Sequence, residues 1–392
     1  MKNYSLNIFG STGEIGSKSI NIINKYYNSI KINLLVANKN YKKLIHQTNL
    51  IKPKHICLLD NTKYEIMLRL VKSKKTKIIH PNDLIKFLNK NYSNITLLSI
   101  SGYNALNYLL PIIKNTKILG IVNKECIVSA GHLLKSLSKK FNTDIFPIDS
   151  EHHSLFNYFN STNNLNHSNI KSIFLTASGG PFYKKNNKNF SVLKALKHPK
   201  WKMGYKNSID SSTLTNKCLE IIEAHYLFNI PYEKLKIIIH PEALVHSIIE
   251  FNNSTSIMNY FYHDMSIPIS NFLKYAIKNK GQDIYKKKYN FKLKNRLDFD
   301  KPKISNYPIL KTFYNLKKNN PINVIKFNCA NEMAVELFIK KMINFRDINK
   351  FIDKSLSLDL HSKVNTINNI IKFHNEYAKL LQSNFYMYNI KK

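Results

Sequence analysis

The sequence is poor in several residues that mark common protein classes. Its 392 residues include four cysteines, which lie far apart and form no CxxC pair, so a zinc ribbon or a disulfide framework is not expected and a reducing cytoplasm is favoured. No run of about 18 uncharged apolar residues occurs, and the N-terminus passes at once into a strand-and-glycine pattern, so we expect no membrane span, signal peptide or transit peptide. Acidic residues are also scarce, 24 against 60 lysines and arginines.

The resulting net charge of +36 does not by itself indicate nucleic-acid binding. Lysines are scattered through every segment beside Asn and Ile, whereas a phosphate-tracking surface clusters basic residues with aromatic ones. AT-rich coding drift explains this composition more simply, so we expect no specific nucleic-acid partner. With 43% hydrophobic residues the chain can form folded cores, and its length predicts two or three domains.

Short apolar runs alternate with helically spaced segments in the first part of the chain. Strands alternating with helices predict a parallel sheet with helices on both faces. Denser polar motifs follow, and the last part has helical periodicity. We therefore predict an α/β protein with an N-terminal Rossmann-like dinucleotide domain (1–148), a central α/β catalytic domain (149–274), a connector (275–306) and a C-terminal helical domain (307–392).

Three glycines, Gly10, Gly13 and Gly16, stand between the first strand and the first helix. Such a turn lets the backbone approach a pyrophosphate at a helix N-terminus, although it can also serve strand–helix packing alone. The second strand ends in VANKN, where Lys39 replaces the acid expected of an NAD enzyme. A cation there suits the 2′-phosphate of NADP, the alternative being a solvated lysine. Glu14 would repel phosphate unless its side chain points away.

Asp149 and Glu151 follow an apolar strand. In an extended segment residues i and i+2 share a face, so both carboxylates can converge on one divalent cation. The alternative is a chance acidic pair at a strand end.

A second polar segment runs from Asp210 to Glu220. Asp210 and Ser211 predict a helix start whose N-terminal amides, with Ser211, can hold a phosphate. Asn216, Lys217 and Glu220 then project from neighbouring helix positions, where a Lys217–Glu220 surface ion pair is the alternative.

Three lesser motifs complete the candidate residues. Ser178 opens a Ser-Gly-Gly turn that can offer a hydroxyl and amides to an anion. The segment 198–204 holds Trp201, the only tryptophan, in a loop that can close over a ligand. His246 suits a buried, hydrogen-bonded histidine as well as a functional one.

Together these motifs resemble the 1-deoxy-D-xylulose 5-phosphate reductoisomerase family. The similarity covers nearly the whole chain in the expected order, through GSTGEIG (10–16), VNKE (122–125), PIDSEH (147–152), SGGPF (178–182), HPKWKMG (198–204), DSSTLTNKCLE (210–220), HPEALVHS (240–247) and NCANE (328–332). It implies a cytoplasmic homodimer that uses NADPH and Mg²⁺ or Mn²⁺. The implied reaction rearranges and reduces 1-deoxy-D-xylulose 5-phosphate to 2-C-methyl-D-erythritol 4-phosphate.

The resemblance also implies a role for each matching position. The metal ligands are Asp149, Glu151 and Glu220, and the catalytic residues are Lys124, Glu151, His198 and Glu220. The cofactor-binding residues are Thr12, Gly13, Glu14, Ile15, Ala37, Asn38, Lys39, Asn40, Asn123, Glu125 and Gly204. The substrate-binding residues are Lys124, Ser150, Glu151, Ser178, His198, Trp201, Met203, Ser211, Asn216, Lys217 and Glu220.

Four positions depart from the family's usual pattern. Glu14 replaces a small polar residue, Asn38 a glycine, Lys197 an arginine and Cys218 a glycine, and we expect effects on cofactor affinity and turnover rather than on the reaction.

Two other functions compete with the implied one. One is a different NADP-dependent sugar-phosphate or semialdehyde reductase, which would not need the acidic metal set. The other is a basic nucleic-acid-binding protein, which would need a localised basic stripe.

Overall fold

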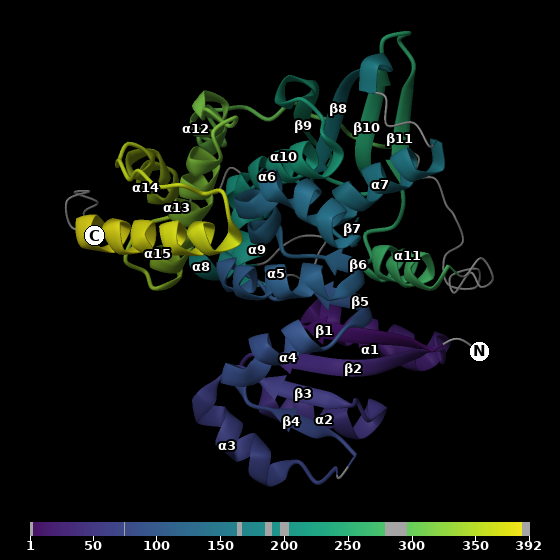
Figure 1. Cartoon of the computed structure of the whole chain (residues 1–392). Helices are drawn as coiled ribbons and strands as arrows, with labels where there is room; N and C mark the ends of the chain where they lie inside the picture. Colours follow the sequence, from purple (N-terminus) through teal and green to yellow (C-terminus); the bar gives the residue numbers. More distant parts are fainter. Residues whose placement is uncertain are drawn as a thin grey trace. The chain divides into compact units, whose positions relative to one another are not determined.

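The computed structural model describes residues 3–73, 75–162, 167–184, 190–196, 204–278 and 296–385 (Figure 1). Within these residues the chain forms two compact units that interleave along the sequence. The first comprises the described parts of Met1–Asn123, Ser136–His153 and Asp264–Leu293, and the second those of Lys124–Lys135, Ser154–His263 and Lys294–Lys392.

The first unit is built on a parallel sheet of seven strands in the order β4-β3-β2-β1-β5-β6-β7. The strands are β1 (Tyr4–Phe9), β2 (Ile30–Ala37), β3 (His55–Leu58), β4 (Lys77–Ile79), β5 (Ser93–Leu98), β6 (Thr116–Ile121) and β7 (Asp144–Pro147). Their central residues are buried runs of Ile, Leu, Val and Phe, as a sheet covered on both faces requires. The helices of this unit are α1 (Glu14–Tyr26), α2 (Tyr41–Ile51), α3 (Asn61–Leu70), α4 (Leu84–Lys90), α5 (Leu106–Lys114) and α11 (Ser266–Ile277), with short 3₁₀ turns at Pro81–Asp83 and Tyr103–Ala105.

The strand order places a switch point beside β1. The chain builds outward from β1 through β2, β3 and β4, and then returns to the other side of β1 for β5, β6 and β7. In open α/β sheets, ligands bind at the carboxyl ends of the strands at such a reversal. The glycine turn that follows β1 therefore stands where this architecture binds its ligand.

Helix α11 joins the first unit although it is distant from that unit in sequence. Phe272 of α11 packs against Phe146 of β7 with ring centroids 5.5 Å apart, and its ring occupies the space that a Cβ at Gly120 of β6 would fill. The Tyr4 hydroxyl donates to the Ile277 carbonyl at 3.2 Å. The buried side chain of Phe272 thus packs α11 against the sheet.

The second unit holds a four-stranded mixed sheet in the order β11-β10-β8-β9. Its strands are β8 (Ile170–Ala177), β9 (Leu235–Ile239), β10 (Val245–Phe251) and β11 (Ser256–Tyr260), with β8 parallel to β9 and antiparallel to β10. Its helices are α8 (Val192–Ala195), α9 (Tyr205–Thr213), α10 (Thr215–Phe228), α12 (Ile309–Asn315), α13 (Pro321–Ile339), α14 (Asp347–Leu356) and α15 (Ile367–Asn384), with 3₁₀ turns at His167–Asn169 and Tyr232–Lys234.

Two helices run across the division between the units. They are α6 (Lys124–Phe141), which begins in the second unit, and α7 (Ser150–Thr162), which begins in the first. Most of helix α11 falls within the range 149–274 that we assigned to a catalytic domain, and its last three residues fall in the predicted connector, yet it packs on the first unit. The two compact units are therefore not consecutive ranges of the sequence. The division of the chain into cofactor-binding, catalytic, connector and helical domains stays a prediction.

None of the described helices is both long enough and apolar enough to cross a bilayer.

Truncating Phe272 to Ala tests the attachment of α11. We expect the variant to lose about 3–5 kcal/mol of unfolding free energy, because a large ring is removed from a fully buried site. Tyr92, which is 59% exposed, provides the control, and Tyr92→Ala should change stability by less than about 0.5 kcal/mol. Urea unfolding measures both, and a Phe272→Ala protein as stable as Tyr92→Ala would contradict this account of the packing.

Candidate active site

The turn after β1 has the predicted strand, glycine turn and helix geometry. Gly10 has a φ of +81°, and a Cβ there would lie 2.5 Å from the Ser99 carbonyl oxygen. Gly13 is the N-cap of α1, and a Cβ at Gly16 would lie 2.3 Å from the Gly10 carbonyl oxygen. No larger residue fits at Gly10 or Gly16 without movement of the backbone. Thr12, Gly13 and Ile15 therefore sit at a tight turn before a helix N-terminus.

Glu14 does not have to face a bound phosphate. Its carboxylate lies 3.4 Å from the Lys18 ammonium, one helical turn along α1, and Lys18 also lies 3.6 Å from Asp264. This pairing offsets the negative charge that the sequence places in the turn.

The predicted adenosine-side residues follow β2. Ala37 ends the strand, Asn38 and Lys39 are exposed, and the Asn40 side chain accepts a hydrogen bond from the Lys43 amide at 3.0 Å, which caps α2. Lys39 thus presents its ammonium to solvent at the carboxyl end of the sheet. Asn40 has a structural function in capping that the motif alone did not indicate.

Asn123 joins the ends of two neighbouring strands. It follows β6, is 3% exposed, and donates from Nδ2 to the carbonyls of Ile100 (2.7 Å) and Gly102 (2.9 Å) after β5. Lys124 and Glu125 come next as the buried first residues of α6. The three polar residues of VNKE are therefore held in place at the start of a helix.

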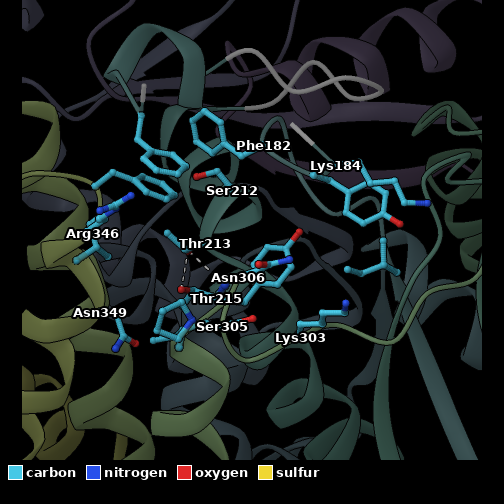
Figure 2. A pocket seen from close by; sticks show the side chains of 18 of the residues that line it. Phe182, Lys184, Ser212, Thr213, Thr215, Lys303, Ser305, Asn306, Arg346 and Asn349 are labelled. Carbon is cyan, nitrogen blue, oxygen red and sulfur yellow. Dashed lines mark hydrogen bonds between the residues drawn. The ribbon is translucent and has the colours of Figure 1, made fainter. Parts of the chain in front are cut away.

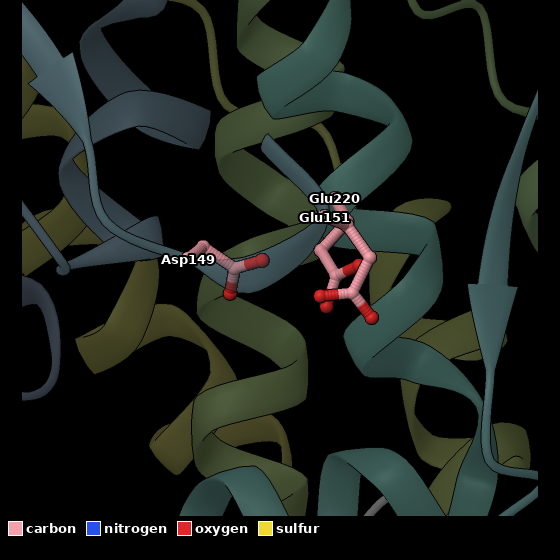
Figure 3. A group of neighbouring side chains, drawn as sticks. All are labelled: Asp149, Glu151 and Glu220. Atoms are coloured by element: carbon pink, nitrogen blue, oxygen red, sulfur yellow. The ribbon is translucent and has the colours of Figure 1, made fainter. Parts of the chain in front are cut away.

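Three carboxylates, Asp149, Glu151 and Glu220, lie close together (Figure 3), and we call them the carboxylate group. One ligand oxygen from each lies within 4.8 Å of the others. The predicted extended geometry is wrong, because Glu151 is in the first turn of α7 and only Asp149 precedes that helix. The Ser150 hydroxyl donates to Glu151 Oε2 at 2.5 Å. Asp149 and His152 are one turn apart, with the imidazole Nδ1 3.4 Å from the carboxylate.

Buried lysines accompany Glu220. The Lys124 ammonium lies 3.2 Å from Glu220 Oε1 and 3.8 Å from Glu223 Oε2, and Lys217 also donates to Glu220. The side chains of Lys217 and Glu220 are only 4% and 1% exposed, so this is not the surface ion pair considered as the alternative. Asn216 donates to the same carboxylate. Charge is thus concentrated out of contact with bulk water, where electrostatic interactions are strong.

The sequence predicted a helix that begins at Asp210, and this prediction is wrong. Asp210 and Ser211 belong to the last turn of α9, and α10 starts at Thr215. Between them Leu214 has a φ of +69°, a left-handed conformation that is strained for leucine. The Thr213 and Thr215 hydroxyls lie 2.8 Å apart across this break. We call residues 210–217 the α9–α10 junction.

The Ser178 turn packs against the α9–α10 junction. Gly180 has a φ of +71°, and a Cβ there would lie 2.7 Å from the Ser211 carbonyl oxygen. Its amide donates to the Ser178 hydroxyl at 3.3 Å. The structure therefore brings together two of the predicted phosphate-binding segments, Ser178 and Ser211, in the second unit.

Some predicted residues are not placed by the structure. Lys197, His198, Trp201 and Met203 lie outside the described residues. Gly204 is described, and it is the exposed N-cap of α9, where a Cβ would have no described atom within 4 Å.

His246 is a buried, hydrogen-bonded histidine, one of the two alternatives that the sequence allowed. It is 2% exposed, its Nε2 lies 3.1 Å from the Phe261 carbonyl, and its ring stacks on the Phe261 ring at 3.8 Å.

The cysteines form no disulfide. All four are buried and free, and burial raises the pKa of the Cys57 thiol to about 12 and that of Cys218 further above its usual value. Cys218, one of the departures from the family pattern, is fully enclosed in α10. It acts there as a small apolar residue rather than as a nucleophile.

Sequence reasoning missed Lys206 and Glu223. Lys206, in α9, is 8% exposed and lies 2.7 Å from Asp210 Oδ2 and 3.2 Å from Glu125 Oε1. The i, i+4 spacing of Lys206 and Asp210 was the only available signal. Lys206 and Glu125 are far apart in the sequence, so no spacing pattern predicts their contact.

A separate cavity of about 820 Å³ lies in the second unit (Figure 2). Its lining includes the hydroxyls of Ser212, Thr213 and Thr215 and the stacked rings of Phe190 and Phe345, whose centroids are 4.9 Å apart. Among the described residues, none that we predicted to bind metal, cofactor or substrate lines it. The cavity therefore borders the α9–α10 junction but does not coincide with the predicted site.

Comparison with known proteins identifies the family. A family model described as 1-deoxy-D-xylulose 5-phosphate reductoisomerase matches residues 6–131, and two models of C-terminal domains of that family match 145–228 and 262–380. The reductoisomerase of Pelagibacter ubique is 38% identical over 352 residues, which cover 88% of this chain and 89% of that protein. The chain belongs to the 1-deoxy-D-xylulose 5-phosphate reductoisomerase family. A Clostridium botulinum member is 34% identical over 391 residues, 97% of this chain and 98% of that protein.

Solved structures of the family share the fold. The Zymomonas mobilis reductoisomerase in complex with NADPH has a TM-score of 0.84 at 27% identity, covering 97% of this chain and 100% of that one. A DOX-P reductoisomerase in complex with NADPH, fosmidomycin and magnesium also has a TM-score of 0.84, at 29% identity and 98% coverage of both chains. The family resemblance and the predicted α/β class with a helical C-terminal region are thus confirmed.

Proposed function

We propose that this chain carries out the reaction of its family with the carboxylate group as its metal site. That reaction is the NADPH- and metal-dependent conversion of 1-deoxy-D-xylulose 5-phosphate to 2-C-methyl-D-erythritol 4-phosphate. The observation that carries the assignment is the convergence of Asp149, Glu151 and Glu220 beside two buried lysines. A reductase that only transfers hydride has no need of such a group.

The carboxylate group suits a hard divalent cation. Its donors are carboxylate oxygens alone, the ligands that Mg²⁺ and Mn²⁺ prefer. With all side chains ionised, these three acids and Glu223 carry four negative charges, against two positive charges on Lys124 and Lys217. The remaining charge of −2 is what one divalent cation neutralises. Such an ion supplies Lewis acidity at the C2 carbonyl and a neighbouring hydroxyl of the ketose.

The chain's own residues then orient the substrate. We propose that Ser178, Ser211, Asn216 and Lys217 bind its phosphate, and the packing of Gly180 on the α9–α10 junction supports this grouping. Asn216 and Lys217 stand one helical turn before Glu220 on α10 and donate to it. The phosphate and metal sites therefore share one rigid helix. Phosphate binding away from the reacting carbons can thus position the reacting end.

The remaining assignments concern residues that contact the reacting end of the substrate and the loop expected to close over it. We propose that Lys124, held by Glu220, and Ser150, held by Glu151, contact the substrate. His198, Trp201 and Met203 stay proposals that rest on the resemblance alone. They belong to the loop expected to close over the ligand.

For the cofactor, the glycine turn at the switch point of the first sheet supports NADPH binding. The backbone amides at the start of α1 can accept the pyrophosphate, and Lys39 can pair with the 2′-phosphate. Asn38, Asn123, Glu125 and Gly204 stay proposed cofactor residues. The Glu125 side chain is buried in an ion pair with Lys206, so we expect any contact it makes with the cofactor to be made without movement of this side chain.

A homodimer and a cytoplasmic location are further proposals. Strand β11 is an edge strand that exposes Ile257 (41%) and Met258 (50%), and uncovered apolar edges of this kind favour pairing with another chain. We propose that a second copy of this chain covers them. Four free, buried thiols suit a reducing compartment.

Assays of the purified protein test the function and its metal ligands together. NADPH should be oxidised on addition of 1-deoxy-D-xylulose 5-phosphate only when Mg²⁺ or Mn²⁺ is present. Glu151→Gln and Glu220→Gln should each weaken Mn²⁺ binding, measured by calorimetry, about 100-fold or more, since even partners outside the ligand shell contribute ten- to a hundredfold. Glu65→Gln, at an exposed position of α3, is the control and should match the unaltered protein.

Turnover of simple aldehydes with NADPH and no metal would instead support a different reductase. Unchanged Mn²⁺ affinity in both Gln variants would refute the ligand assignment.

Replacing Lys39 by Ala should raise the Michaelis constant for NADPH roughly tenfold, the effect of one charge-assisted hydrogen bond, and leave that for NADH nearly unchanged. Lys42→Ala removes an exposed lysine three residues further along and should change neither constant. Steady-state kinetics with both cofactors measure this. Equal changes for NADPH and NADH would remove the 2′-phosphate assignment.

Met258→Lys tests the proposed dimer. The unaltered protein should sediment at twice the 45.7 kDa chain mass, and the variant should sediment as the single chain because a buried charge disfavours pairing. Leu50→Lys places the same charge at another exposed apolar residue and should leave the dimer intact. A monomeric unaltered protein at micromolar concentration would overturn the proposal.

A further inference from the structure

A network around a buried lysine, Lys206, links three helices of the second unit. From α9 its ammonium lies 2.7 Å from Asp210 Oδ2 on the same helix and 3.2 Å from Glu125 Oε1 on α6. The other oxygen of Asp210, Oδ1, accepts a hydrogen bond from Asn331 Nδ2 on α13 at 2.9 Å. Lys206, Glu125 and Asp210 are 8%, 2% and 0% exposed, and Asn331 is fully buried. We call these four residues the Lys206 network.

The charge of Lys206 is permanent in the working range of pH. Burial by itself would lower the pKa of this ammonium, but the carboxylates of Asp210, Glu125 and Glu332 raise it above its usual value. Lys206 therefore stays a cation in this network, and its protonation does not act as a switch.

Stability alone does not account for such a network. Taking charges out of water costs free energy, and well-packed apolar residues in the same space are often as stabilising or more so. What a buried ion pair can provide instead is a defined geometry, because its charges are satisfied in few arrangements.

The two carboxylates paired with Lys206 each stand beside a proposed substrate ligand. Glu125 follows Lys124, which itself lies 3.2 Å from Glu220. Asp210 precedes Ser211, at the α9–α10 junction. Through these two carboxylates Lys206 connects the start of α6, which carries Lys124, with the end of α9, which carries Ser211.

The α9–α10 junction needs such support. Leu214 holds a left-handed conformation, which costs of order 1–3 kcal/mol and persists only where surrounding contacts determine it. Asp210 lies four residues before Leu214 and is bonded through both of its oxygens. Its partners hold the last turn of α9 in place while the chain reverses direction into α10.

We propose that Lys206 is a positioning residue, which holds Lys124 and the α9–α10 junction at the separation that the phosphorylated substrate requires. It acts through Glu125 and Asp210 and does not contact the substrate. This inference rests on the proposed function, because it presumes that the two segments bind the same sugar phosphate.

Two variants separate positioning from plain stabilisation. Lys206→Met removes the cation, and Lys206→Met with Asp210→Asn removes one charge of each sign, which restores the original net charge of the network. If the network only balances charge, the double variant should recover both stability and kinetics. If Lys206 sets geometry, the double variant should recover stability while the Michaelis constant for 1-deoxy-D-xylulose 5-phosphate stays raised.

Lys326→Met is the matched control. Lys326, in α13, is also a buried lysine of the second unit, but its ammonium donates to the Leu358 carbonyl at 2.7 Å rather than joining these carboxylates. Its removal should alter stability without changing the Michaelis constant or kcat.

The experiment combines thermal unfolding, steady-state kinetics and calorimetric binding of 1-deoxy-D-xylulose 5-phosphate with Mg²⁺ in the absence of NADPH. We expect Lys206→Met and the double variant to bind the sugar phosphate roughly tenfold more weakly or worse, as for loss of one charge-assisted hydrogen bond, with a smaller fall in kcat. If Lys206→Met does not fold, Asp210→Asn alone decides, since it keeps the side-chain shape and should also weaken binding.

Folded variants that bind the sugar phosphate as tightly as the unaltered protein would overturn the positioning role. Recovery of wild-type affinity in the double variant would overturn it equally. Failure of the proposed function is a separate result, seen when the unaltered protein neither binds nor turns over the sugar phosphate.

Discussion

The second unit depends on buried charge that must be balanced locally. The chain has 24 acids among 392 residues, and in its described part five acids are buried, of which four, Glu125, Asp210, Glu220 and Glu223, form ion pairs with buried lysines. Each unbalanced charge in such a place would cost several kcal/mol, so the acids and lysines have to be positioned together. Helices α6, α9 and α10 meet where this requirement is satisfied. Asp149 and Glu151, which are only partly buried, add the negative charge that the proposed divalent cation would neutralise.

Much of the first unit could be predicted from the sequence, because its signals are local. The turn is marked by Gly10 and Gly16, where a Cβ would collide with the backbone, and short apolar runs alternating with helical segments predict a parallel sheet. The course of α11 could not be predicted in this way. It packs on that sheet through Phe272, and an amphipathic helix does not reveal which distant surface buries it.

The sequence predicted that Asp149 and Glu151 lie together, but it did not predict their local geometry. Asp149 and Glu151 were correctly grouped, although for a wrong reason, because Glu151 belongs to the first turn of α7. The helix boundary was misplaced since the break falls at Leu214, where no glycine or asparagine marks a left-handed residue. Lys206 escaped notice for a statistical reason. In so lysine-rich a chain one more lysine carries no information until its distant partner Glu125 is known.

The large positive charge of the whole chain and the negative charge of the site act over different distances. At physiological ionic strength the Debye length is about 8 Å, so surface lysines attract anionic ligands such as NADPH and sugar phosphates only during approach. A divalent cation meets repulsion from the same lysines, but that repulsion is screened, whereas the carboxylate oxygens lie within 4.8 Å of one another. Local charge therefore decides what is bound, and overall charge affects how fast anions arrive. Drift toward lysine on the surface is compatible with a metal-dependent active site for this reason, as long as the buried acids and their lysines remain paired.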